Sequence, residues 1–144
     1  MKEEKIILIK LFLFVVIIIF FSSKTYAHGI IIVSGVEHNE GFIDVKIYID
    51  KESFLNEEMA AETIRKRASK GKTVIPLSRL HKGTIAIVVY HDEDGNGELK
   101  TGLFWRPKEG FAFSNNYTPR GRPKFKKAAI ELVHGEPVNI ELNY

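Results

Sequence analysis

The sequence has no cysteine among its 144 residues, and this absence removes several classes of protein. Disulfide frameworks, thiolate metal sites and cysteine nucleophiles are all excluded. The serine-hydrolase pattern G-x-S-x-G and the zinc-protease pattern H-E-x-x-H are also missing from the sequence. A stable domain must therefore depend on buried apolar side chains or on a bound ion.

Long apolar runs are absent except near the N-terminus, where residues 11–21 are uninterrupted by charge and follow three lysines. Thr25 and Ala27 provide the small residues of a signal-peptidase site. We therefore expect residues 1–27 to be a signal peptide and residues 28–144 to be an exported domain, periplasmic or extracellular and with no membrane attachment after cleavage. The alternative is an uncleaved anchor over residues 6–21, but Lys10 interrupts it and it is shorter than the ~20 residues that a membrane-spanning helix needs.

The chain also has almost no excess of one charge sign once the signal peptide is removed. The full chain has a net charge of +3, and residues 28–144 keep 17 basic and 16 acidic residues, a net charge of +1. A nearly neutral exported domain is not expected to bind nucleic acid. The expected partners are an unknown protein or a glycan at the cell envelope.

Alternation of apolar and polar residues predicts a mostly β protein. In residues 42–50, Ile43, Val45 and Ile47 alternate with other residue types, which predicts one buried and one solvent-facing side. Pro76 predicts an edge position for its strand, because proline lacks the N–H donor that a sheet ladder needs. We expect strands at residues 29–36, 42–50, 72–80, 84–90, 125–133 and 137–144, the last two forming a hairpin.

Residues 51–70 differ from this pattern and predict one short helix. Glu57 and Glu58 near its start and the basic residues near its end match the helix dipole, and Gly71 is a typical stop. The thin apolar stripe of this segment predicts a peripheral position. With turns between short strands and no βαβ alternation, we expect an all-β fold, a single antiparallel Greek-key β-sandwich of about seven strands.

An acidic turn at the end of the 84–90 strand begins like a calcium-binding loop. Short oxygen-bearing side chains alternate along the chain before Gly97, so they can converge on one hard cation. The pattern then fails, because Lys100 and Leu103 occupy positions that usually help to bind the ion. Weak Ca²⁺ binding and an ordinary Asp-Gly turn with no cofactor both remain open. The candidate metal ligands are Asp92, Asp94, Asn96, Glu98 and Glu109.

Aromatic and amide side chains follow the acidic turn and include the only tryptophan of the chain. Together they could form a platform for a sugar or a peptide, or they could cover the open end of the sandwich. The candidate ligand-binding residues are Trp105, Phe111, Ser114, Asn115 and Asn116.

Four ordered motifs carry a resemblance to a known family. They are LHKGTIAI at residues 80–87, HDEDGNGEL at 91–99, PKEGFAFSNN at 107–116 and PKFKKA at 123–128. The chain thereby resembles the DUF2141 family of bacterial exported proteins. The resemblance implies an immunoglobulin-like or prealbumin-like sandwich and does not imply an activity. Ile85 in place of an aromatic residue and Lys100 in place of an acid depart from the family pattern.

Taken together, these patterns favour a non-catalytic exported binding or structural module that uses loop 91–116. The alternative is a hydrolase-type enzyme that uses His91, Asp92 and Glu109 as acid and base groups. Neighbouring residues on a strand point to opposite faces, so His91 and Asp92 are not expected to face one substrate. We therefore expect no enzymatic activity.

Overall fold

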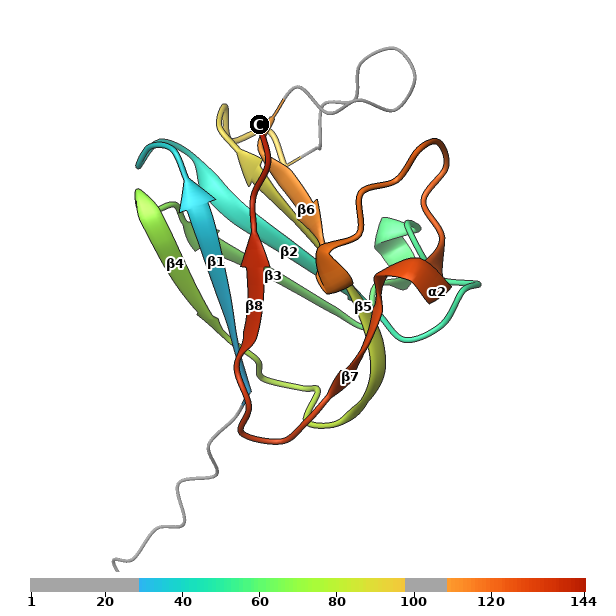
Figure 1. Cartoon of the computed structure of the whole chain (residues 1–144). Helices are drawn as coiled ribbons and strands as arrows, with labels where there is room; N and C mark the ends of the chain where they lie inside the picture. Colours follow the sequence, from blue (N-terminus) through green and yellow to red (C-terminus); the bar gives the residue numbers. More distant parts are fainter. Residues whose placement is uncertain (1–28, 98–108) are drawn as a thin grey trace, which may run out of the picture.

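The computed structural model describes residues 29–97 and 109–144, and these residues form two β-sheets (Figure 1). A three-stranded sheet has the order β4-β1-β8, and a five-stranded sheet has the order β3-β2-β5-β6, with β7 paired to β5. The strands are β1 (Ile30–Val36), β2 (Phe42–Tyr48), β3 (Glu62–Arg67), β4 (Gly71–Pro76), β5 (Gly83–Asp92), β6 (Phe111–Phe113), β7 (Ala129–Leu132) and β8 (Val138–Glu141). The 3₁₀ turns η1 (Glu57–Met59) and η3 (Ser114–Asn116) and the helix α2 (Phe125–Ala128) complete the described elements.

The main core lies between the two sheets. Ile43, Val45 and Ile47 of β2 are fully buried, as the period-two pattern predicts. Ile85, Ile87 and Val89 of β5 join them. The three-stranded sheet contributes Ile31, Val33, Ile75 and Ile140. The mostly β fold is therefore confirmed, and it rests on one apolar layer shared by both sheets.

The other face of β2 is not exposed to solvent, contrary to the sequence prediction. Asp44, Lys46 and Tyr48 are at most 7% exposed. Tyr48 belongs to a second, smaller apolar cluster in which Phe54 and Phe125 cover the sheet from the outside. Loops far apart in sequence thus fold over this face, and alternation within one strand could not reveal them.

The predicted helix over residues 51–70 is wrong. Residues 62–67 form strand β3, which pairs antiparallel with β2, and only η1 is helical in that segment. β3 is an edge strand of the sheet, and charged residues are common on edge strands because they discourage pairing with other chains. The short α-helix of the structure is α2, in the segment that was expected to be a strand.

Two further expectations about topology are also wrong. β1 and β8 pair in parallel, so the fold is not purely antiparallel. β7 and β8 do not form a hairpin, because β7 joins β5 in one sheet and β8 joins β1 in the other. Periodicity tells which side of a strand is buried but not which strand lies beside it.

The edge position predicted from Pro76 is confirmed, since β4 ends the three-stranded sheet. No helix among the described residues is long and apolar enough to cross a membrane.

Candidate functional site

The acidic turn at the end of β5 is organised around the side chain of Asp92. Its Oδ1 accepts hydrogen bonds from the backbone N–H groups of Gly95 and Asn96, at 3.0 and 3.1 Å. Its Oδ2 accepts from the N–H of Gly97 at 2.8 Å and from the Arg65 guanidinium at 2.6 Å. A carboxylate offers about four acceptor positions, so these four donors fill the capacity of Asp92.

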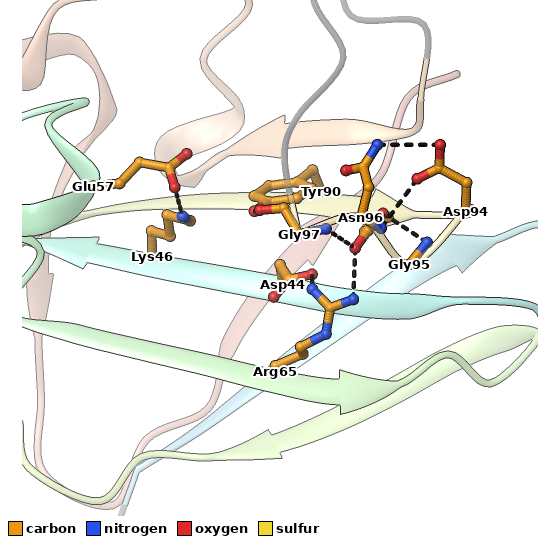
Figure 2. Close-up of polar contacts among 10 residues, drawn as sticks. Asp44, Lys46, Glu57, Arg65, Tyr90, Asp94, Gly95, Asn96 and Gly97 are labelled. Carbon is orange, nitrogen blue, oxygen red and sulfur yellow. Dashed lines mark hydrogen bonds and ion pairs between the residues drawn. The ribbon is translucent and has the colours of Figure 1, made fainter.

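Arg65 joins two strands and the turn, as Figure 2 shows. From β3 it donates to Asp44 of β2 at 2.7 Å and to Asp92 at the end of β5 at 2.6 Å. The guanidinium also lies over the Phe42 ring, 4.2 Å from its centroid. Arg65 therefore places a positive charge against the carboxylate at the base of the turn. The sequence prediction missed it, since its neighbours depend on the register of β3 against β2.

The two carboxyl groups that Arg65 contacts respond in opposite directions. Burial raises the pKa of Asp44, and the guanidinium of Arg65 offsets this only in part. Burial also acts to raise the pKa of Asp92, but the Gly97 N–H and the Arg65 guanidinium outweigh it, and the pKa is lowered from its ordinary value. Asp92 is thus held ionised by its own hydrogen bonds.

The predicted metal ligands come together only in part. Carboxylate oxygens of Asp92, Asp94 and Glu109 lie within 4.8 Å of one another. Asn96 lies in the turn, but its side-chain N–H₂ donates to Asp94 at 3.1 Å. Glu98 lies outside the described residues. Hydrogen bonds within the protein therefore hold the turn in shape, as expected for an Asp-Gly turn, which was one of the two alternatives from the sequence.

His91, the predicted base, lies on the other face of β5 from Asp92. It is fully buried, and both of its ring nitrogens are bonded. Nε2 lies 2.7 Å from the carbonyl oxygen of Glu40 and therefore carries the proton. Nδ1 then accepts from the hydroxyl of Tyr144 at 2.6 Å, and this hydroxyl in turn accepts the N–H of Glu37 at 3.2 Å. The structure thus fixes the tautomer of His91. Its two ring nitrogens connect β5 to Glu40 in the turn between β1 and β2 and to Tyr144.

A second histidine, His38, packs against His91 with its ring tilted by 41°, and it was not predicted as a site residue. Their ring centroids are 4.6 Å apart. Nδ1 of His38 lies 2.9 Å from a carboxylate oxygen of Glu40, and Nε2 lies 3.4 Å from one of Glu93. His38 and His91 are far apart in sequence, so spacing gave no signal; their proximity follows from the turn between β1 and β2, which folds over the end of β5.

The predicted ligand-binding residues have different surroundings. Ser114 is buried, and its hydroxyl bonds to the backbone of Ile87 and of Ala128. Asn115 donates to the carbonyl of Lys127 at 3.0 Å. Phe111 is half-buried and packs against the smaller apolar cluster, Asn116 is exposed, and Trp105 lies outside the described residues. Ser114 and Asn115 thus anchor the segment from β6 to β7.

Asn116 lines a pocket of about 260 Å³ beside the end of β6. Two aromatic rings of this pocket, Phe113 and Tyr117, lie with their centroids 5.7 Å apart and tilted by 54°. The polar lining comes from both ends of the described segment 109–144 and consists of Asn116, Thr118, Glu141 and Asn143. The pocket therefore offers mainly amide, hydroxyl and carboxylate groups beside the half-buried ring of Tyr117, while the Phe113 ring is almost fully buried.

Comparison with known proteins gives one match. A family model described as an uncharacterized protein conserved in bacteria, DUF2141, matches residues 31–141. No curated protein and no solved structure matches the chain. The family model covers nearly the whole described domain, including the acidic turn and the segment from β6 to α2. The chain belongs to the DUF2141 family.

Proposed function

We propose that this protein is an exported, non-catalytic β-sandwich module that binds a glycan at the cell envelope. The observation that carries the proposal is the pocket beside β6, in which the half-buried ring of Tyr117 lies next to amide and carboxylate groups. Sugars bind to such surfaces because their C–H faces pack on aromatic rings while their hydroxyls bond to amides and carboxylates. Export rests on the signal-like residues 1–27.

Lack of catalysis is supported by how the candidate acid and base groups are used. His91 is buried with both nitrogens bonded, and the four acceptor positions of Asp92 are occupied. A general base must reach the proton that it removes, and neither group is directed to a common substrate position. We propose instead that both residues hold the end of β5 in shape.

We propose that the acidic turn needs no Ca²⁺ to hold its conformation. Arg65 contacts Asp92 where a cation would otherwise balance its charge. A bound ion would have to compete with this guanidinium and with three backbone donors. Any Ca²⁺ binding at Asp94 and Glu109 is therefore expected to be weak.

The architecture fits a modified Greek-key sandwich of immunoglobulin-like or prealbumin-like type, which we include in the proposal. Its support is that the chain crosses between the two sheets at β1–β2, β3–β4, β4–β5 and β7–β8. The parallel pairing of β1 with β8 is the modification.

Glycan binding is tested by NMR titration of residues 28–144 with soluble oligosaccharides, including chains of N-acetylglucosamine. Shifts are expected to concentrate at the pocket, and Tyr117→Ala should weaken binding about tenfold, which corresponds to the loss of one ring contact worth roughly 1.4 kcal/mol. Asn139→Ala is the matched control, because Asn139 is exposed on β8 but does not line the pocket.

Two outcomes would contradict the proposal. One is the absence of any shift at millimolar oligosaccharide, and the other is equal weakening by Tyr117→Ala and Asn139→Ala. Release of reducing ends from the oligosaccharides by the wild-type protein would favour the hydrolase alternative.

A further inference from the structure

We propose that His38, His91 and Glu93 form a binding site for a divalent transition-metal ion such as Zn²⁺. The site lies on the opposite side of β5 from the acidic turn and is separate from the pocket beside β6. One potential ligand atom from each of the three residues lies within 4.8 Å of the other two. Two imidazoles and one carboxylate are a common ligand set for zinc, and they leave a fourth position open.

The closest pair of ligand atoms already has the spacing of a coordination shell. Nε2 of His38 and Oε2 of Glu93 are 3.4 Å apart. For metal–ligand bonds of about 2.0–2.1 Å, two ligands of a tetrahedral ion lie about 3.4 Å apart. One ion can therefore contact both atoms without moving either residue far.

Glu40 lies beside the remaining nitrogen of each histidine. Its backbone carbonyl accepts from Nε2 of His91 at 2.7 Å, and its carboxylate lies 2.9 Å from Nδ1 of His38. This Nδ1 is shielded from solvent and makes no hydrogen bond in the structure. Histidines that bind metals usually donate their second N–H to a carboxylate or carbonyl. The Glu40 carbonyl fills that role for His91, and the Glu40 carboxylate lies close enough to Nδ1 of His38 to take it up when an ion binds. This leaves Nε2 of His38 and Nδ1 of His91 for the ion.

The third ligand atom, Nδ1 of His91, is occupied by the hydroxyl of Tyr144. Tyr144 is half exposed, so its ring can turn outward when an ion takes its place. The side chains of His38 and Glu93 are 34% and 36% exposed, so an ion can enter from solvent and meet the buried His91.

The donor set selects the class of metal. Imidazole nitrogen suits Zn²⁺, Cu²⁺, Ni²⁺ and Co²⁺, whereas Ca²⁺ and Mg²⁺ prefer sites made only of oxygen. Calcium is therefore the control cation for this site, and zinc is the probe.

The test is calorimetric titration of the protein, without an added tag, with Zn²⁺. We expect one site per chain, a higher melting temperature with Zn²⁺, and at least tenfold weaker binding in His38→Ala and in Glu93→Gln. His134→Ala is the matched control, since His134 also lies near a second imidazole, with its ring centroid 6.1 Å from that of His81, but belongs to no cluster of three metal-binding groups among the described residues. It should bind Zn²⁺ like the wild type.

Binding that survives both His38→Ala and Glu93→Gln overturns the proposal, as does the absence of zinc binding to the wild type. The melting temperature of each variant without metal shows whether it is folded. If His38→Ala does not fold, His38→Gln replaces it, because glutamine keeps a polar side chain at this turn. Equal responses to Ca²⁺ and Zn²⁺ would also count against the proposal.

Discussion

At the scale of single residues, Arg65 connects strands β2 and β3 to the acidic turn, although none of the site motifs in the sequence includes it. Its guanidinium contacts the carboxylates of Asp44 and Asp92, which are 3% and 0% exposed. Removing one partner of a buried ion pair is costly, because the other charge stays buried without compensation. Here one cation compensates two carboxylates, so its loss affects both.

We expect Arg65→Met to lower the free energy of unfolding by about 3 kcal/mol, toward the low end of the range for broken buried pairs because a third of the Arg65 side chain is exposed. Urea denaturation measures the change. Arg67→Met is the control, since Arg67 also lies over the Phe42 ring, at 5.0 Å, but forms none of the ion pairs found among the described residues. Equal losses in the two variants would show that packing on Phe42, and not the ion pairs, is what stabilises the turn.

At the scale of elements, the turn between β1 and β2 is shaped to lie against the end of β5. Gly41 has a φ of +69°, and a Cβ added there would overlap the carbonyl oxygen of Asp92 and approach Cα of Glu93 to 2.8 Å. The same turn carries His38 and Glu40 to His91. The positions of both candidate ion sites, one on each face of β5, therefore depend on a glycine in this turn.

Gly41→Ala is expected to destabilise the protein by about 3 kcal/mol or more, because backbone strain adds to steric overlap. Gly71→Ala separates these two effects, since Gly71 also has a positive φ, +82°, but has open space around it. It should cost only about 1–2 kcal/mol. Chemical denaturation of both variants gives the difference, and equal costs would mean that the close approach of the turn to β5 does not constrain the fold.

The sequence predicted those strands whose apolar residues meet the core. It failed where the position of a segment depends on which strand pairs with it. β2 alternates because one of its faces meets the core, and β5 is apolar on both faces because both are covered. β3 carries Arg65, Lys66 and Arg67, and its charges imitate the end of a helix although they belong to a sheet edge. In the site, the proximity of Asp92 and Asp94 follows from their spacing. The proximity of Arg65 or His38 follows only from strand register, which local patterns do not contain.

At the scale of the whole molecule, acid stability combines two opposing contributions. Asp92, whose pKa is lowered from 3.8, stabilises the fold above this value, and that stabilisation is lost as the pH falls through the pKa of the folded state. Asp44, whose pKa is raised from 3.8, destabilises the fold at neutral pH, and protonation relieves this effect as the pH falls toward 3.8. The two contributions partly cancel in the wild type.

In Asp44→Asn, the stabilisation that the wild type gains when Asp44 is protonated is absent. The stabilisation that is lost when Asp92 is protonated remains. Its free energy of unfolding is therefore expected to fall more steeply than that of the wild type between about pH 5 and pH 3. Urea denaturation at a series of pH values measures both curves. Glu136→Gln, which removes an exposed carboxylate from a turn, controls for net charge. Parallel curves for Asp44→Asn and the wild type would contradict the prediction.

Because β1 pairs in parallel with β8, the three-stranded sheet can form only after both of these strands have been synthesised. Ile31 lies beside Val138 and Ser34 beside Glu141, so the first and last strands must meet before the three-stranded sheet exists. Contacts between such distant segments form slowly, because a long loop has to close first. During synthesis, β1 and β4 can pair early, but β1 keeps one unpaired side until the C-terminal residues emerge. If the chain is exported as an unfolded thread, this order delays closure of the sheet until nearly all of the domain has crossed the membrane.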